Sequence, residues 1–570
     1  MNRVLIPLTI LGSIVLIAPS AGALTVTVPD NYSTIQAAHD AGATVIQVRD
    51  GIFPGSVVIT HDCSIIPYPT VSGQFAAAPW IQGSISVNPP IGISVLVRGM
   101  RVSGRATTGG GSSSLITFEG CRLDSGLVVA RFSNCAVRYN MITSLGITAV
   151  GPWAADIVGN TVVGGIYAEQ SEAGVRIQNN FVLGPAPVGI YAHDVDGDAS
   201  VHQDIVTGAT RGIDFDAGGF ARTTDYNQVS NCSGDGIVAH GYIGNAVVDN
   251  IVTNCSGRGI VASSSSMPSG NGKSIVRRNV VSATGSHGIE IDADHGAVTD
   301  NTVLDAHGAG IIATPGAIAD SLVDNLVLRA NGAGCDLASA SVLQFNTIGR
   351  CGGDGVHIDA TPAGASLAQN TVYLNAGDGY DLSSATVSTL TRNIAYGSSQ
   401  YGLRASGGVP VLSCNDWFGN TSGATLGVSP GGSDLSANPL FCNLPADIVA
   451  LSAGSPLASG PCAVVGSKTV GCASATDVTS SISVPARLGA HPVPTQGNVE
   501  FRLPHRAEAG TLQVFDATGA LRWRANVSES GDSWVWDLRD LSGRVVPNGV
   551  YYARLTAGTQ SWSVPVTVIR

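Results

Sequence analysis

The sequence has few charged residues, few aromatic residues and no long apolar run beyond its first 23 positions. Charged side chains make up 12% of the 570 residues and the formal net charge is −12. Nucleic acid is therefore not expected as a partner, because phosphate backbones are bound by basic surfaces. Disorder is not expected either, because 44% of the residues are hydrophobic and 72 are glycines that recur periodically. No segment after residue 23 is long and apolar enough to cross a membrane.

Two further patterns are missing. The central region shows no sustained apolar period of 3.6 residues, so amphipathic helices are not expected there. None of the 11 cysteines has the Cys-x-x-Cys spacing of structural zinc sites, which argues against a structural zinc site.

The one long apolar run lies at the N-terminus. Arg3 precedes an apolar stretch at residues 4–17, and Ala21-Gly22-Ala23 follows as a small-x-small cleavage site. This pattern predicts a signal peptide over residues 1–23, with no membrane span after cleavage. The alternative is a membrane anchor, for which the apolar core is short. We therefore expect a secreted, extracellular or cell-surface protein.

A short sequence motif recurs through the centre of the chain: an Asn, an apolar pair, several polar residues, then Gly and an apolar residue. Its twelve steps are 20–29 residues long, a spacing typical of a solenoid. The Asn slot is occupied at Asn140, Asn160, Asn180, Asp204, Asn227, Asn250, Asn279, Asn301, Asn325, Asn346, Asn370, Asn393 and Asn415.

Each repeat carries strand signals. Residues 212–216, 288–292 and 355–359 alternate apolar and polar side chains with a period of two. A repeat of about three short strands has nowhere to bury its apolar side chains except on neighbouring repeats. The sequence therefore predicts a parallel β-helix, in which the Asn amides form a ladder between successive coils.

The repeated Asn-x-Val followed by Gly-Ile, as at residues 279–281 and 288–289, resembles the right-handed parallel β-helix repeat of pectin-lyase-like proteins. The resemblance covers residues 24–472 and implies the fold, but lyases, hydrolases, epimerases and non-enzymatic adhesins share it. The paired Asp-Asp and Gly-His-Gly of the pectinolytic hydrolases are missing. Their nearest counterparts, such as Gly353-Asp354-Gly355 and Ser286-His287-Gly288, occupy the repeating turn slot and are explained by turn geometry.

The ends of the solenoid differ from its repeats. Residues 29–53 predict a cap made of a short helix and a strand, with Asn31 or Ser33 at the helix N-terminus and Gly42 at its end. Cys232 and Cys255 occupy equivalent positions in neighbouring repeats, and a disulfide and a pair of buried thiols are both open. At the far end, four cysteines predict a disulfide-stapled closure: Cys414, Cys442, Cys462 and Cys472.

Residues 473–485 predict a linker rich in Ser, Thr and Ala, and residues 486–570 a small antiparallel β-sandwich. The segments 516–519, 536–544 and 548–552 resemble the immunoglobulin-like domain of the flagellar hook-capping protein and C-terminal sorting domains. That resemblance implies a bacterial exported protein whose last domain serves attachment, sorting or spacing. The complete fold expectation is an all-β chain, a right-handed parallel β-helix followed by this sandwich.

The strand that follows each Gly-apolar pair has alternate residues pointing outward, so stacked coils should form two outward columns on one sheet. The first column is Tyr167, Tyr191, Asp214, Val238, Val261, Glu290, Ile312, Asp336, His357, Asp381 and Arg404. The second column is Glu169, His193, Asp216, His240, Ser263, Asp292, Thr314, Ala338, Asp359, Ser383 and Ser406.

Two polar patches lie along these columns. In the first, acids and imidazoles on successive coils should be roughly 5 Å apart, a spacing suited to proton transfer. Its candidate catalytic residues are Glu169, His193, Asp214, Asp216 and His240, with Tyr167 and Tyr191 as candidate sugar-binding residues. The second supplies further candidate substrate-binding residues: Glu290, Asp292, His357, Asp359 and Arg404. The alternative for both patches is an ordinary polar face with no ligand.

Asp194, Asp196 and Asp198 form a separate loop of alternating carboxylates that is a candidate Ca²⁺ site, although its Gly is misplaced for an EF-hand. No other cofactor is expected, and the chain is expected to be a monomer. Two functions follow from these patterns. The first is a secreted or cell-surface protein that binds polysaccharide or cell-surface glycan, or that displays a surface toward it. The alternative is a polysaccharide-active enzyme, a lyase or epimerase, that uses the acid, His and Tyr patch.

Overall fold

The computed structural model describes most of the chain from residue 24 onward. The described residues are 24–68, 78–88, 92–109, 114–129, 134–194, 198–217, 221–241, 245–264, 274–292, 296–314, 319–360, 366–382, 389–473, 489–491, 495, 497–502, 510–516, 520–527, 533–547, 549–557 and 560–568. The expected signal peptide lies outside them, as does all of the expected linker but its first residue. No helix in these ranges is long and apolar enough to cross a membrane.

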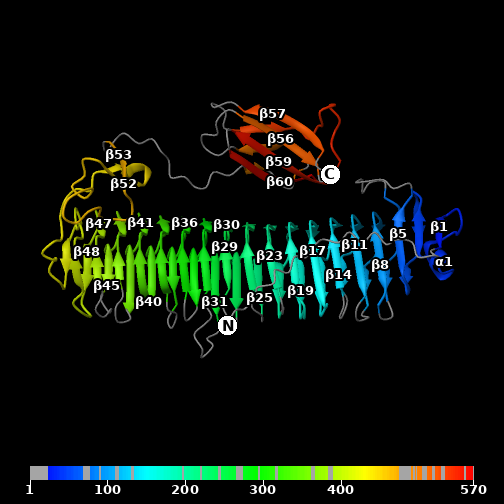
Figure 1. Ribbon diagram of the computed structural model, residues 1–570, viewed down its shortest axis with the longest axis horizontal. Helices are drawn as coiled ribbons and strands as arrows, with labels where there is room; N and C mark the ends of the chain where they lie inside the picture. The colour runs from blue at the N-terminus through cyan, green and yellow to red at the C-terminus, as the bar shows by residue number, and fades with distance from the viewer. Residues whose placement is uncertain are drawn as a thin grey trace, which may run out of the picture.

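The described part of the solenoid is a stack of coils with parallel strands on three faces (Figure 1). This arrangement confirms the parallel β-helix that the repeat predicts. Sheet B, the second face, contains 16 strands from β3 (Ile52–Pro54) to β47 (Ile394–Tyr396). The other two faces form one hydrogen-bonded system of 34 strands, because β40 (Cys335–Gln344) continues from one face to the other.

Sheet A, the first face, runs from β1 (Thr25–Val28) and β2 (Val45–Val48) to β49 (Val411–Ser413). Sheet C, the third face, carries both outward columns. Besides β40, its strands are β4 (Val57–Ile59), β7 (Ile85–Val87), β10 (Ala106–Thr108), β13 (Leu127–Val129), β16 (Ile147–Val150), β19 (Ile166–Glu169), β22 (Val188–His193), β25 (Arg211–Ala217), β28 (Ile237–Gly241), β31 (Ile260–Ser264), β34 (Ile289–Asp292), β37 (Ile311–Ala313), β42 (Val356–Ala360), β45 (Tyr380–Leu382), β48 (Tyr401–Ala405) and β50 (Gly423–Leu426).

The inward side chains of the three sheets form one continuous apolar column. Ile213, Ile237, Ile260, Ile289 and Ile311 stack in register on successive strands of sheet C, and all five are fully buried. This column is where each repeat buries the apolar surface that it cannot cover alone.

The Asn ladder is present and continuous from Asn140 to Asn415. In most steps both the backbone N–H and Nδ2 donate to the side-chain oxygen of the next Asn, as from Asn250 to Asn279 at 2.9 and 3.0 Å. The same Nδ2 also donates to a backbone carbonyl of the preceding coil, as in Asn250 Nδ2 to Thr224 O at 2.8 Å. Asp434 accepts from Asn415 and extends the ladder by one coil beyond the repeat that the sequence defines.

The N-terminal cap contains α1 (Ile35–Asp40), followed by β2 as expected. The expected N-cap was wrong. The helix is capped by Thr34, whose hydroxyl accepts from the backbone N–H of Ala37 at 3.0 Å, whereas Asn31 accepts from the N–H of Thr27 on β1. Ile35 and Ala38 are buried at the end of the core, so the helix closes the open coil.

The segment after the last coil returns along the outer surface of sheet B. Its strands β51 (Phe441–Asn443), β52 (Ile448–Ser452) and β53 (Val470–Cys472) form a small sheet. Phe441 and Leu451 belong to one apolar cluster with Leu328, Tyr373 and Ile394 of sheet B. The segment therefore covers side chains of several coils in addition to closing the end.

The expected disulfide-linked closure is present as two disulfides, Cys414–Cys462 and Cys442–Cys472. The other seven cysteines are free and buried. Of the two possibilities for Cys232 and Cys255, the structure therefore has buried thiols.

The C-terminal strands form two antiparallel sheets, as expected for a sandwich. One contains β54 (Gly489–His491), β55 (Val499–Arg502) and β58 (Ser533–Trp536). The other contains β56 (Gly510–Asp516), β57 (Leu521–Val527), β59 (Gly549–Ala557) and β60 (Gln560–Val568). Phe501, Leu512, Trp536, Leu555 and Val566 lie in a core separate from that of the solenoid.

Candidate functional site

The outward columns on sheet C have the register that the repeat predicts. Tyr167 pairs with Tyr191, Tyr191 with Asp214 and Asp214 with Val238. The first column then continues rung by rung to Arg404. The first column is not uniformly solvated, because Asp214, Val238 and Val261 are buried despite their outward direction.

Three aromatic rings form a stack on β19 and β22. The centroids of Tyr167 and Tyr191 are 4.3 Å apart, those of Tyr191 and His193 are 3.9 Å apart, and both pairs are nearly parallel. Both faces of the Tyr191 ring are therefore covered. Tyr167, at the end of the stack, is 37% exposed, and its hydroxyl donates to Glu169 Oε2 at 3.1 Å. Burial and the Glu169 carboxylate raise the pKa of Tyr167, so its hydroxyl stays protonated in the physiological range.

The Asp214 carboxylate holds two neighbouring side chains in place. His193 Nε2 lies 2.8 Å from Asp214 Oδ1, and the guanidinium of Arg211 pairs with Asp214 Oδ2. Burial alone would raise the pKa of Asp214, but the hydrogen bonds from His193 and Arg211 hold it below its ordinary value. The result is an ionised carboxylate that fixes the orientation of an imidazole. We call Tyr167, Glu169, Tyr191, His193, Arg211, Asp214 and Asp216 the aromatic–acid patch.

The sequence columns missed Arg211. It stands at the start of β25, outside both columns, and its long side chain reaches Asp214 three residues later. The signal was visible as an Arg directly before the repeating Gly of one coil. His240 is placed on the next rung beside Asp216, but its Nδ1 bonds to the hydroxyl of Ser263 on the following coil.

The second expected patch is divided into two parts. Glu290 on β34 is separated from His357 on β42 by the rungs of Ile312 and Asp336. Glu290 pairs with Arg258 Nη1 at 2.6 Å, and Asp292 accepts from the Thr314 hydroxyl at 2.7 Å. Like Arg211, Arg258 directly precedes a repeating Gly and was missed by the columns.

The other part surrounds β42, β45 and β48. His357 lies close to both Asp381 and Asp359, and Asp381 pairs in register with Arg404. Arg404 Nε bonds to Asp378 Oδ2 at 2.5 Å, and Asp378 is buried. The guanidinium of Arg404 is thus held by a carboxylate of its own protein. The expected Ca²⁺ loop lies largely outside the described residues, and of its three carboxylates only that of Asp194 is described, as an exposed side chain.

The model of the right handed beta helix region family matches residues 164–341 and 269–416. This match lies in the repeats that carry both parts of sheet C just described. It agrees with the fold seen in the structure and with the expected handedness. No curated protein sequence matches the chain.

Three solved structures that resemble the chain are distant from it. The A-module of the Azotobacter vinelandii mannuronan C-5 epimerase AlgE6 is 13% identical with a TM-score of 0.23, covering 71% of this chain and 93% of that one. The periplasmic alginate epimerase AlgG is 10% identical with a TM-score of 0.16, covering 72% and 82%. The tailspike protein of Acinetobacter phage vB_ApiP_P1 is 12% identical with a TM-score of 0.22, covering 96% and 79%. Likenesses this weak carry no argument about the function of this chain.

Proposed function

We propose that this chain is a secreted or cell-surface β-helix protein that binds polysaccharide through the aromatic–acid patch of sheet C. The observation that carries the proposal is the concentration of Tyr, His, acid and Arg side chains on the outward side of three successive strands, β19, β22 and β25. Sugars are bound by planar polar groups that pair with hydroxyls and by exposed aromatic surface. The C-terminal sandwich then serves attachment, sorting or spacing, as its resemblance implies.

The geometry favours an extended ligand. Successive strands lie about 4.8 Å apart and are held by parallel ladders, so the polar groups form a fixed row along the solenoid axis. The Tyr167 ring, at one end of the stack, is 37% exposed, while Tyr191, with both faces covered, presents its edge. Trp153, which is 50% exposed, lies in the turn after β16, the strand that pairs with β19. A chain of sugars along this row would meet ring faces at one end and hydrogen-bonding edges beyond it.

Replacement of Tyr167 by Ala is expected to weaken polysaccharide binding about tenfold, because it removes the exposed ring at the end of the stack. The measurement is affinity for a panel of acidic and neutral polysaccharides by titration calorimetry. Tyr226→Ala is the matched control. Tyr226 is also half-exposed, but it lies between β26 (Ala221–Asp225) of sheet A and β27 (Gln228–Ser230) of sheet B, away from sheet C. Equal effects of the two substitutions, or no binding by the unmodified chain, would contradict the proposal.

A second function is supported by the contact of His193 with Asp214. If the Nε2 proton is directed to Asp214, the lone pair of Nδ1 remains available as a base. A uronic acid residue has an acidic C5 proton beside its carboxylate. If loss of that proton is followed by departure of the O4 substituent, an unsaturated sugar forms. If O4 stays attached and a proton returns to C5 on the other face, the epimer forms. Arg211, which pairs with Asp214 but remains 39% exposed, offers a cation for the sugar carboxylate, and protonated Tyr167 a proton donor.

Asp216→Ala tests this second function. Asp216 lies in the second column, two residues after Asp214 on β25 and in register with His240. If the chain is a lyase, ultraviolet absorbance of unsaturated product should appear with the unmodified protein on a uronic acid polysaccharide and fall at least tenfold in the variant. An epimerase would instead change the proton NMR spectrum of the polymer. Absence of both signals, with binding retained, would leave the binding function alone.

A further inference from the structure

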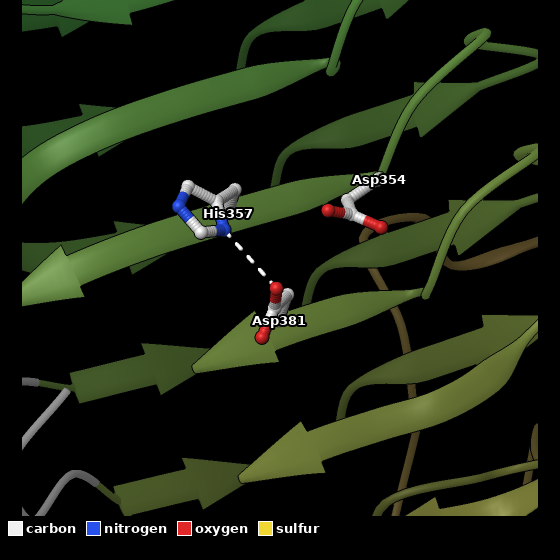
Figure 2. Close-up of side chains that lie close together, drawn as sticks. All are labelled: Asp354, His357 and Asp381. Carbon is white, nitrogen blue, oxygen red and sulfur yellow. Dashed lines mark hydrogen bonds and ion pairs between the residues drawn. The ribbon is translucent and has the colours of Figure 1, made fainter. Parts of the chain in front are cut away.

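We propose that Asp354, His357 and Asp381 bind a divalent transition-metal ion of the zinc or manganese class on sheet C, several coils away from the aromatic–acid patch. The three residues come from two neighbouring coils. Asp354 lies in the turn before β42, His357 lies on β42, and Asp381 lies on β45 directly in register with His357. One donor atom from each lies within 4.8 Å of the others. Figure 2 shows the three side chains directed toward one another above the two strands.

The surroundings of the imidazole point to a cation. His357 Nδ1 lies 3.3 Å from Asp381 Oδ2, and Nε2 lies 3.2 Å from Asp359 Oδ1. A neutral imidazole has one N–H, so it can donate to only one of these carboxylates. The lone pair of the other nitrogen would then face a carboxylate oxygen unless a proton or a metal ion lies between them.

Asp359 completes the arrangement. Metal-binding histidines commonly donate their second N–H to a carboxylate, which fixes the tautomer and the ring orientation. With the Nε2 proton directed to Asp359, Nδ1 is left for an ion shared with Asp381 and Asp354. Asp359 is thus a positioning residue, since it acts through His357.

Arg404 lies near the carboxylates around His357 and interacts electrostatically with Asp381 and Asp354. Arg404 is held by Asp378, and one oxygen of Asp354 accepts from the backbone N–H of Asp378 at 2.6 Å. The group thus places three carboxylates, Asp354, Asp359 and Asp381, beside one imidazole, and a divalent ion would offset part of their negative charge.

The donor set selects the class of ion. An imidazole nitrogen with two carboxylate oxygens suits zinc, manganese and similar ions, whereas Ca²⁺ prefers oxygen ligands alone. Bonds of about 2.1 Å to a tetrahedral ion place donors about 3.4 Å apart. The Nδ1–Oδ2 distance already meets this spacing, and rotation of the Asp354 carboxylate would bring in the third donor. The three residues are only partly buried, so positions remain for water or an anionic sugar.

The test uses the full chain and the metal ions alone. Equilibrium dialysis against Zn²⁺, Mn²⁺ and, separately, Ca²⁺ measures ions bound per chain. The unmodified protein should bind one more Zn²⁺ or Mn²⁺ than His357→Asn or Asp381→Asn, with affinity reduced at least tenfold in both variants. Asp359→Asn should weaken binding about tenfold without removing the site. His202→Asn is the matched control, because His202 also faces a carboxylate, Asp225 at 2.9 Å, on sheet A.

Equal stoichiometry and affinity in the unmodified protein and His357→Asn would overturn the proposal. So would the absence of Zn²⁺ and Mn²⁺ binding at micromolar concentrations. Circular dichroism of each variant shows whether its strands remain. If His357→Asn does not fold, the isosteric Asp381→Asn decides by the same criteria.

Discussion

Ile289→Asp is expected to destabilise the solenoid by roughly 5 kcal/mol or more. The Ile289 side chain is fully buried in the apolar column, between Ile260 and Ile311 on the neighbouring strands. Removing a buried Ile costs about 2–5 kcal/mol in contacts and cavity. Burying a carboxyl group without a partner adds several kcal/mol, whether the group stays ionised or takes up a proton. The unfolding midpoint in denaturant, followed by circular dichroism, measures the change.

Ile275→Asp provides the control for that experiment. Ile275 lies on β32 (Ser274–Arg277) of sheet A, but it points outward and is 39% exposed. Its new carboxylate would stay in water, so a change within about 1 kcal/mol is expected. If Ile289→Asp shifted the midpoint no more than Ile275→Asp, the inward direction of the Ile289 side chain would be wrong.

Much of the solenoid could be predicted because every coil repeats the same short sequence pattern. The Asn slot and the Gly-apolar pair set both the turn and the register, so errors do not accumulate along the chain. The stacking of Tyr167, Tyr191 and Asp214 follows directly from that register. The ends have no repeat to guide them. Thr34 was overlooked as the helix cap because three neighbouring residues have side chains that can serve, and only backbone geometry selects one.

The return of residues 435–472 over sheet B could not be predicted either. It depends on contacts between residues far apart in the sequence. The side chains of Arg329, Arg350 and Tyr373 all bond to Asp447, and the Thr347 and Ser467 hydroxyls bond to each other. A pattern of short strands shows that such a segment exists but not which face of the solenoid it covers.

The candidate sites were predicted in part, for a reason of geometry. Alternation along a strand identifies which residues point outward, and this placed Tyr191, His193 and Asp214 together. It says nothing about side chains in the turns. Arg211 lies at the very start of β25, and Asp354 lies in the turn before β42, where the sequence pattern indicates only turn geometry. Both reach neighbours that sequence spacing would not pair.

The Asn ladder contains one exception with a large expected effect. Asp204 occupies the Asn slot between Asn180 and Asn227 and is fully buried. Its Oδ1 accepts from the backbone N–H and Nδ2 of Asn180 at 2.7 and 2.9 Å. Its Oδ2 is buried without a hydrogen-bond partner, at the position where an Asn would present its Nδ2 donor. Burial raises the pKa of Asp204 from 3.8 to about 7, although the bonds from Asn180 act in the opposite direction.

The sign of the resulting pH dependence is fixed by that shift. Below about pH 4 the carboxyl group is protonated in the folded and the unfolded chain, so folding costs nothing at this group. Between pH 4 and about pH 7 the unfolded chain has lost a proton that the folded chain still holds, and stability falls as pH rises. Above pH 7 both states are ionised and the loss stays constant. The difference between 3.8 and about 7 corresponds to roughly 4 kcal/mol.

Asp204→Asn is therefore expected to stabilise the solenoid by roughly 5 kcal/mol at pH 8, because an amide supplies the missing donors and carries no charge. At pH 4 the gain should shrink to about 1 kcal/mol, since a protonated carboxyl group already donates one hydrogen bond. Denaturant midpoints of both proteins at pH 4 and pH 8 measure the difference, and any other buried acid cancels in the comparison. Asn250→Asp is the reciprocal control: it places the same carboxyl group in an intact step of the ladder and should lower stability over the same pH range. A gain of equal size at both pH values would show that Asp204 is not protonated in the fold, and a loss at pH 8 would show that its carboxylate has a partner.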